Sequence, residues 1–408
     1  MVFSVSEPTH LGILGGGQLA GLLAQAANAL SLPTTVFSES SKLCTFARQA
    51  ALSVVESDDL ESPFVQSGLA KVNHLTFENE WVSAQKLGQM ELQFPSLELC
   101  PPLKAFECIS DKLLQKKKIA SLGIPTLPFL KWDFPTQSWE AFEKTVAQTL
   151  GYPCVLKLAR GGYDGRGVRV VESQTAFLTE AKDWARKALS QSATKGDLYA
   201  EVALDSPQEF ARVVVRGKDG CVVFFPLMQT LQRNGMCFVV QGPAREFGVS
   251  EECEKDTTRA LTHLVESIEY VGALAAEFFY DGHELWVNEL APRVHNSGHY
   301  SSLALTHSQF DLHVRACCGL PLPQPVAKAP FFGMVNWLGA ASELPPSPQW
   351  SARAHEKTGL ELELFWYGKT GSSGERRKLG HVNALAWKKS EWVAGLSQLV
   401  ALRENEEA

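Results

Sequence analysis

The stretch GYPCVLKLARGGYDGRGVRVV, residues 151–171, largely determines the fold that the sequence predicts. Two apolar, β-type runs flank a loop with four glycines, and Lys157 lies on the first run. Glycines let backbone N–H groups approach phosphate oxygens closely, and a neighbouring lysine supplies positive charge. The stretch therefore predicts a β-hairpin whose loop holds a phosphate, although a hairpin that merely needs flexible corners would show the same pattern. It is not a Walker A motif, because no Gly-Lys-Ser/Thr follows the glycines.

A second stretch, AAEFFYDGHELWVNELAPRVHNSGH (residues 275–299), carries two acids, Glu277 and Glu289, on apolar runs joined by a short loop. Magnesium that bridges nucleotide phosphates is usually held by one or two carboxylates. A two-residue turn at Asp281-Gly282 would place the two acids on opposite faces of the hairpin. A longer loop centred on His283 would place them opposite each other, where both could share a metal ion. The sequence leaves both registers open. Surface positions on an edge strand are a further alternative, but the apolar strand around Glu289 favours function.

The loop that follows concentrates polar side chains, namely Arg293, His295, Asn296, Ser297 and His299. Two histidines four residues apart could bind zinc, but zinc enzymes with that spacing carry the pattern H-E-x-x-H on a helix. The Asn-Ser-Gly turn predicts a loop here instead. Donors gathered on a loop in this way are typical of an anion-binding site.

The N-terminal stretch LGILGGGQLAGLL, residues 11–23, fits the dinucleotide-binding fingerprint G-x-G-x-x-G/A through Gly15, Gly17 and Ala20. Glu39 follows the next strand-like run, where a ribose-binding acid would be expected. Taken alone, this stretch predicts an NAD(P)- or FAD-dependent oxidoreductase. That alternative leaves the glycine loop of residues 161–167 and the paired glutamates unexplained. Alternating strand-like and helix-like runs up to about residue 105 predict an open α/β unit.

The composition is that of an ordinary globular protein: 408 residues, 45% hydrophobic and 20% charged, which is too long for a single core. A net charge of −7 argues against nucleic acid as the main partner. Nine cysteines without a C-x-x-C pair fit a reducing compartment better than a disulfide framework or a zinc site. Residues 11–30 carry no charge, but their five glycines favour a buried strand and helix over a membrane span. We therefore expect a cytoplasmic protein without a membrane segment.

Proline-rich stretches suggest where the domains meet. Pro101-Pro102 and the segment GLPLPQPVAKAP (residues 319–330) interrupt the regular patterns. We predict an N-terminal Rossmann-like domain over residues 1–105, a central domain over 106–320 and a small, mainly β C-terminal domain over 321–408. The lysine run 116–118 lies in a helix predicted over 109–123 and is interpreted as its solvated face.

Together these motifs closely resemble the ATP-grasp family of 5-(carboxyamino)imidazole ribonucleotide synthases. The resemblance rests on GGGQLA (15–20), ISDKLLQKK (109–117), LKLARGGYDGRG (156–167), the two glutamates and NELAPRVHNSGHYS (288–301). It continues through THSQFDLHVRACCGLPL (306–322) to YGKTGSSGERRKLGH (367–381) and so covers nearly the whole chain. It implies a central ATP-grasp domain, an N-terminal glycine loop that binds a ribonucleotide rather than a dinucleotide, and a homodimer. The implied reaction is carboxylation of aminoimidazole ribonucleotide with ATP and bicarbonate through carboxyphosphate.

The resemblance also implies roles for individual residues. ATP would be bound by Lys112, Lys157, Gly162, Gly165, Glu201, Val202, Glu209 and Asn288. The ribonucleotide would be bound by Gly17, Gln18, Leu19, Tyr163, Asp164, Gly165, Arg293, His295, Asn296, Ser297, Lys369, Arg376 and Arg377. Glu277 and Glu289 would ligate magnesium. Lys157, Tyr163, Asp164 and Arg293 would lie closest to the chemistry, under a glycine-rich lid that shields labile carboxyphosphate from water.

Several positions depart from the family pattern. Gly21 stands where the family usually has an arginine, and Ala211 where it has a serine. Gln229, Thr230 and Gln232 replace an acid, an asparagine and a histidine, and residues 370–376 form a longer spacer than usual. These changes leave open an ATP-grasp ligase that acts on a different acceptor.

Overall fold

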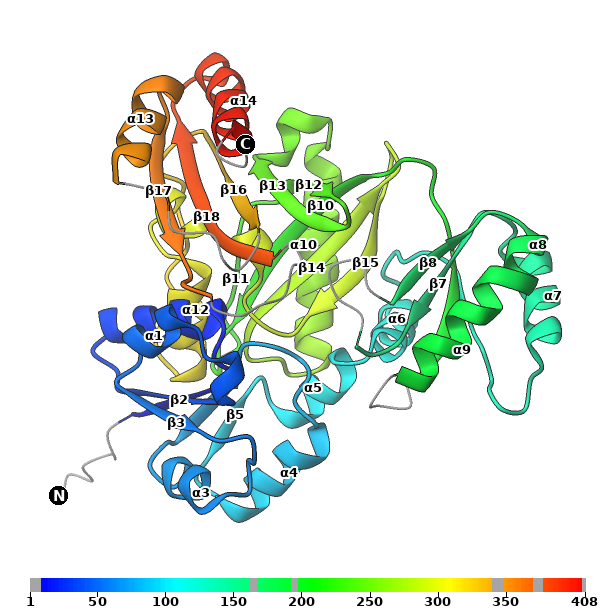
Figure 1. Cartoon of the computed structure of the whole chain (residues 1–408), viewed down its shortest axis with the longest axis horizontal. Helices are drawn as coiled ribbons and strands as arrows, with labels where there is room; N and C mark the ends of the chain where they lie inside the picture. The colour runs from blue at the N-terminus through cyan, green and yellow to red at the C-terminus, as the bar shows by residue number, and fades with distance from the viewer. Residues whose placement is uncertain are drawn as a thin grey trace.

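The computed structural model of the protein describes residues 9–161, 167–191, 197–339, 346, 348–369 and 377–405. Three β-sheets organise this part of the chain: a five-stranded parallel sheet, a four-stranded antiparallel sheet and a nine-stranded antiparallel sheet. Figure 1 shows the parallel sheet in blue at the lower left, the four-stranded sheet at the right and the large sheet above and to the left of the latter. Among the described residues, no helix is both long and apolar enough to cross a membrane.

The N-terminal unit is the predicted open parallel sheet, with strand order β3-β2-β1-β4-β5. The charge-free residues 11–30 form a buried strand, a glycine turn and a helix, as predicted. The strands are β1 (Leu11–Leu14), β2 (Thr34–Ser38), β3 (Ser53–Glu56), β4 (His74–Phe77) and β5 (Glu98–Cys100). The helices are α1 (Gln18–Ala29), η1 (Ser40–Lys42), α2 (Thr45–Ala50), α3 (Pro63–Leu69), α4 (Ala84–Gln93) and α5 (Leu103–Ile109).

The four-stranded sheet contains the stretch 151–171 and has the order β6-β9-β7-β8. Its strands are β6 (Phe129–Lys131), β7 (Cys154–Leu158), β8 (Val168–Val171) and β9 (Leu198–Val202). β7 and β8 form the predicted hairpin, with Lys157 opposite Val168. Helix α7 (Trp139–Thr149) packs on this sheet around Trp139, Phe142 and Phe177. A long helix follows, made of α8 (Gln174–Ala176), a π turn (Phe177–Ala181) and α9 (Lys182–Gln191). Helix α6 (Lys112–Ser121) precedes the sheet.

The large sheet has the order β15-β14-β10-β12-β13-β16-β18-β17, and β11 pairs with β10. Its first six strands in sequence are β10 (Gln208–Arg216), β11 (Val222–Phe224), β12 (Met228–Arg233), β13 (Met236–Gly242), β14 (Gly272–Tyr280) and β15 (Leu285–Ala291). The C-terminal strands are β16 (Phe331–Gly339), β17 (Glu361–Trp366) and β18 (Arg377–Ala386). The helices are η3 (Ala244–Phe247), α10 (Glu251–Ser267), η4 (Asn296–Gly298), α11 (Ser301–Ala304), α12 (Gln309–Cys317), α13 (Pro348–Thr358) and α14 (Lys389–Asn405).

The C-terminal strands extend the central sheet, because β16 pairs with β13 along Val239–Gly242. The segment after β17 then reaches the N-terminal unit. Phe46 N donates to Tyr367 O and Thr45 N donates to Gly368 O, both at 3.4 Å. Buried apolar residues of α1 and α12 share one core cluster. The N-terminal, central and C-terminal parts of the chain therefore all contact one another.

Candidate active site

The two glutamates of the β14–β15 hairpin lie opposite each other, but for a reason that the sequence did not reveal. Tyr280 pairs with Leu285, so the loop has four residues, Asp281 to Glu284. A regular ladder continued from Phe278–Val287 would bring Glu277 opposite Asn288. A β-bulge at this point leaves Asn288 as the extra residue and pairs Glu277 with Glu289 instead. The bulge thus brings both carboxylates to the position that the shared-metal register required.

Glu277 has the electrostatic environment of a cation ligand. Burial raises the pKa of its carboxyl group well above the ordinary value, and the neighbouring Glu289 and Glu209 raise it further. The side chain nevertheless keeps 37% of its surface accessible, so a small ion could reach it. Two facing carboxylates suit magnesium, which prefers oxygen ligands and keeps several water molecules. The donor set therefore fits the predicted metal.

Lys112 lies beside this pair at the first residue of α6. Its Nζ donates to Glu289 Oε2 at 2.7 Å, and its backbone N donates to Ala159 O at 2.9 Å. Burial alone would lower the pKa of Lys112, but the nearby carboxylates, Glu289 foremost and then Glu277 and Glu80, together raise it. Asp111 starts the helix by accepting hydrogen bonds from the N–H groups of Leu113 and Leu114. The cap fixes Lys112 between the glycine-loop strand and the paired acids.

Lys157 points from β7 toward the bulge. Its Nζ donates to Asn288 Oδ1 at 2.8 Å and lies 3.3 Å from Glu201 Oε2. Lys116 approaches the same Glu201 oxygen at 3.1 Å. The interpretation of Lys116 as a solvated residue is wrong: it is 1% exposed, and burial lowers its pKa to about 8. The helical spacing Leu113, Lys116, Ile119 could have placed it on the buried face.

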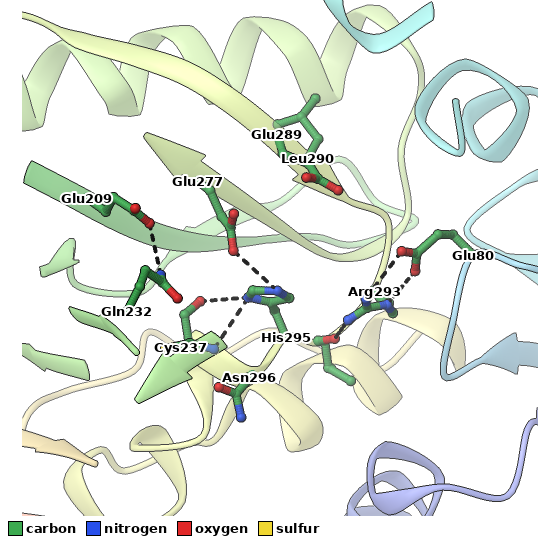
Figure 2. Close-up of polar contacts among 12 residues, drawn as sticks. Glu80, Glu209, Gln232, Cys237, Glu277, Glu289, Leu290, Arg293, His295 and Asn296 are labelled. Carbon is green, nitrogen blue, oxygen red and sulfur yellow. Dashed lines mark hydrogen bonds and ion pairs between the residues drawn. The ribbon is translucent and has the colours of Figure 1, made fainter. Parts of the chain in front are cut away.

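Arg293 connects the central unit to the N-terminal unit. Its Nε donates to Glu80 Oε2 at 2.7 Å and its Nη2 to Glu80 Oε1 at 3.4 Å (Figure 2). Glu80 was not predicted. The sequence signal was the acid-rich FENE directly after a buried strand, since ligand-facing residues follow the carboxyl ends of parallel strands.

His295 lies between Glu277 and Ser297, the latter in the turn of the same loop. Its Nε2 is 3.6 Å from Glu277 Oε1 (Figure 2). Its Nδ1 faces Ser297 Oγ at 2.9 Å. Burial, and then Arg293, lowers the pKa of His295 to about 3, which keeps the ring neutral. His299 is buried elsewhere and its Nδ1 contacts Gln309 at 3.1 Å. The two histidines face different partners, which gives the zinc alternative no support.

Asn296 is engaged in protein contacts. Its Nδ2 donates to Asn336 Oδ1 at 3.0 Å, and Asn336 Nδ2 donates back at 2.7 Å. Gln309 holds the neighbouring main chain: its Oε1 accepts from His295 N at 2.9 Å and its Nε2 donates to His295 O at 2.7 Å. Side-chain amides from β16 and α12 therefore fix the loop. A substrate contact by Asn296 remains a prediction.

Cations from the C-terminal part of the chain form a further group. Lys369 follows β17, and burial, then Arg377 and Lys378, lowers its pKa to about 8. Lys378 also acts electrostatically on Glu277 and His295, although it was not predicted. Lysine and arginine side chains gathered in this way suit a phosphate group. Four of the residues predicted to bind the ribonucleotide, Tyr163, Asp164, Gly165 and Arg376, lie outside the described residues, as does Gly162.

The N-terminal glycine loop already binds a carboxyl group of the protein itself, that of Glu78. Gly17 N donates to Glu78 Oε1 at 2.7 Å and Ala20 N donates to Glu78 Oε2 at 3.2 Å. A pyrophosphate would need the same N–H groups at the start of α1. Gln18 is half-buried beside them, whereas the side chain of Leu19 is buried in the core. The arrangement gives no support to the dinucleotide alternative.

Three departures from the family pattern have local explanations. A side chain at Gly21 would overlap the ring of Phe46, so an arginine does not fit there in this packing. Gln232 Nε2 donates to Glu209 Oε2 at 2.9 Å (Figure 2), and Gln241 Nε2 donates to Gln229 Oε1 at 2.9 Å. Val202 ends β9, Thr230 pairs with Glu209, and Ala211 is buried opposite Glu277.

A separate buried group, Cys100, His313 and Cys317, has metal-ligating atoms within 4.8 Å of one another. Ala273 N donates to His313 Nδ1 at 2.9 Å, so the ring proton is on Nε2, which contacts Thr76 Oγ1 at 2.8 Å. A histidine that binds a metal normally uses its unprotonated nitrogen. This network therefore joins the N-terminal and central units and does not fit a zinc site.

Family models match the chain in three successive parts. They are described as a ribonucleotide synthetase preATP-grasp domain (residues 9–110), an ATP-grasp domain (117–310) and a phosphoribosylaminoimidazole carboxylase C-terminal domain (333–394). The chain is 36% identical over 381 residues to the N5-carboxyaminoimidazole ribonucleotide synthase of Synechococcus elongatus, covering 93% of this chain and 90% of the relative.

Solved structures agree over nearly the full length. The N5-carboxyaminoimidazole ribonucleotide synthetase of Thermus thermophilus is 32% identical, with a TM-score of 0.80 and 96% and 98% of the two chains covered. The N5-carboxyaminoimidazole synthase of Aspergillus clavatus, in complex with ADP and 5-aminoimidazole ribonucleotide, is 26% identical, with a TM-score of 0.80 and 98% and 99% covered. On its length-wide similarity and its three successive domain matches, this chain belongs to the family of N5-carboxyaminoimidazole ribonucleotide synthases.

Proposed function

We propose that the residues described above carry out the ATP-dependent carboxylation of 5-aminoimidazole ribonucleotide with bicarbonate as the carbon source. Phosphoryl transfer from ATP to bicarbonate gives carboxyphosphate and ADP. The exocyclic amine of the ribonucleotide then takes up the carboxyl group, and phosphate leaves. The observation that carries this proposal is the bulged hairpin that places Glu277 opposite Glu289. Lys112 donates a hydrogen bond to Glu289, and Lys157 donates one to the bulge residue Asn288.

The phosphate-transfer half of the site would lie between β7 and the β14–β15 hairpin. Phosphoryl transfer needs little covalent help from the protein and depends on positioning and on neutralising the moving charge. Lys112 and Lys157 supply positive charge there, and Glu277 and Glu289 would hold magnesium. Held by these two carboxylates, magnesium would supply positive charge that offsets the charge of the phosphates. Glu209, oriented by Gln232, would accept hydrogen bonds from the nucleotide ribose.

The ribonucleotide half would lie between the N-terminal glycine loop, the loop of Arg293 and the cations after β17. Lys369 and Arg377 would bind its phosphate, in keeping with their positive charge. Arg293 is held by Glu80 so that its guanidinium keeps a fixed place between the two halves. We expect a homodimer, as the resemblance to the family implies, and a cytoplasmic location, which the scattered cysteines favour.

The test is ADP release measured with ATP, magnesium and bicarbonate, with and without aminoimidazole ribonucleotide. We expect strong stimulation by the ribonucleotide, together with bicarbonate-dependent formation of the carboxylated product, followed by isotope-labelled bicarbonate. ADP release that ignores the ribonucleotide would instead indicate another acceptor. No ADP under any of these conditions would contradict the proposal altogether.

A further inference from the structure

Lys116 is a fully buried lysine whose role the proposed reaction leaves unexplained. It lies on α6 and is 1% exposed. Its Nζ donates to Thr126 Oγ1 at 2.7 Å and to Val287 O at 3.3 Å, and it lies 3.1 Å from Glu201 Oε2. Two donors of the ammonium group therefore have hydrogen-bond partners, and its charge is paired with the Glu201 carboxylate. A side chain of this kind is seldom buried without such pairing, which points to a specific task.

The partners of Lys116 belong to different parts of the ATP-grasp unit. Glu201 lies on β9 of the four-stranded sheet, whereas Val287 lies on β15 of the large sheet, directly before Asn288. Thr126 bridges to Val287 in the segment that leads into β6, and its Oγ1 donates to Val287 O at 2.9 Å. Lys116 therefore connects the four-stranded sheet to the β14–β15 hairpin, which carries Glu277 and Glu289.

This group contains two positive charges and one negative charge, so it has a net positive charge that would attract a polyphosphate. Lys116 and Lys157 share the single carboxylate of Glu201, at 3.1 Å and 3.3 Å. Both Lys116 and Glu201 are 1% exposed, so water screens their interaction weakly. Without Lys116, the Glu201 carboxylate would be neutralised by Lys157 alone. The positive charge of Lys157 would then be compensated by the protein and would attract a phosphate less.

We propose that Lys116 is a positioning residue of the ATP site: it neutralises Glu201 and so leaves Lys157, held by Asn288, free to bind a nucleotide phosphate. This inference rests on the proposed function, in which Lys157 contacts ATP. It assigns Lys116 no contact with either substrate. Its effect should therefore appear in ATP affinity and not in ribonucleotide affinity.

The test compares Lys116→Met with Lys117→Met, a matched control that removes an exposed lysine from the same helix. Magnesium–ADP binding is measured by titration calorimetry, and KM values are measured for ATP and for the ribonucleotide. Because hydrogen bonds to charged groups contribute about 1.5–3 kcal/mol, we expect Lys116→Met to weaken ADP binding roughly tenfold to a hundredfold. The ribonucleotide KM and the Lys117→Met variant should match wild type.

A double variant separates positioning from mere folding. In Lys116→Met/Glu201→Gln the buried ion pair becomes neutral, which proteins usually tolerate, and no carboxylate remains to compensate Lys157. We expect this variant to bind ADP more tightly than Lys116→Met alone. Losses that simply add in the double variant would overturn the proposal, as would unchanged ADP binding in a folded Lys116→Met protein. If wild type itself failed to bind ADP, the proposed function would fail first.

Discussion

Replacing Arg293 by alanine should destabilise the protein, because Arg293 is the partner of a mostly buried carboxylate. Its guanidinium reaches both oxygens of Glu80, at 2.7 and 3.4 Å, and the two side chains are 17% and 20% exposed. Removing one partner of a fully buried pair costs about 3–5 kcal/mol. Partial exposure reduces this, and hydrogen bonds to charged groups contribute about 1.5–3 kcal/mol. We therefore expect Arg293→Ala to lower the free energy of unfolding by about 2–3 kcal/mol.

The measurement is the urea unfolding midpoint at neutral pH for a four-member cycle: wild type, Arg293→Ala, Glu80→Gln and the double variant. The double variant should lie closer to wild type than Arg293→Ala does, since it leaves no unpaired carboxylate. Arg259→Ala, which removes an exposed arginine with two acidic partners on α10, serves as the control and should change little. Equal midpoints for Arg293→Ala and wild type would refute the pairing.

The same pair predicts a pH dependence. Burial alone would raise the pKa of Glu80, but Arg293 outweighs it and lowers the pKa below the ordinary carboxyl value. A carboxyl group with a lowered folded-state pKa stabilises the fold above its unfolded-state pKa, and this contribution disappears as pH falls through the folded-state pKa. The advantage of wild type over Arg293→Ala should therefore shrink below about pH 4. A difference that stayed constant down to acid pH would contradict the charge mechanism.

Three further predictions concern the metal, the phosphate and the glycine loop. Glu289→Gln should reduce ADP formation about a hundredfold or more by removing a magnesium ligand, and near-normal turnover would overturn that assignment. The KM for the ribonucleotide should rise as pH increases through about 8, because Lys369 loses its proton there. A Lys369→Arg variant should shift that rise to higher pH, and a KM that is flat in wild type would exclude Lys369 from phosphate binding. Gly17→Ala should destabilise the fold by about 1–3 kcal/mol, since its Cβ would lie 2.7 Å from Glu78 Oε2, whereas Gly88→Ala on α4 should be tolerated in urea unfolding.

The sequence predicted the first strand and helix and the β7–β8 and β14–β15 hairpins because each has a strong local signal. An apolar run on each side of a glycine turn predicted β1 and α1. The apolar run that carries Lys157 before the glycine loop predicted β7. The register of Glu277 and Glu289 was not decidable in the same way. A bulge at Asn288 shifts the pairing by one residue, and the bulge residue makes a contact with a distant part of the chain, Lys157. Such tertiary contacts leave no periodic trace in sequence.

Residues that support the site were missed for a related reason. Lys116 was interpreted from its charge, although its helical position on the buried face carried more information. Glu78 and Glu80 follow β4, a strand whose short run of letters gave no hint that it lies beside β1. Parallel neighbours bring their carboxyl ends together, so an acid after one strand faces the glycines after the other. Only the strand order β3-β2-β1-β4-β5 makes that juxtaposition visible.

The G-x-G-x-x-G/A pattern at Gly15, Gly17 and Ala20 therefore indicates a backbone geometry and does not identify a ligand. Glycines at 15 and 17 leave space that a Cβ would deny to the Glu78 side chain. The N–H groups of Gly17 and Ala20 then bind that carboxylate, as they would bind a phosphate oxygen in a dinucleotide enzyme. A chain whose own carboxyl group occupies these N–H donors leaves them unavailable to a pyrophosphate. The same glycine pattern can thus persist in an enzyme whose phosphate contacts would come from cations elsewhere, such as Lys369 and Arg377.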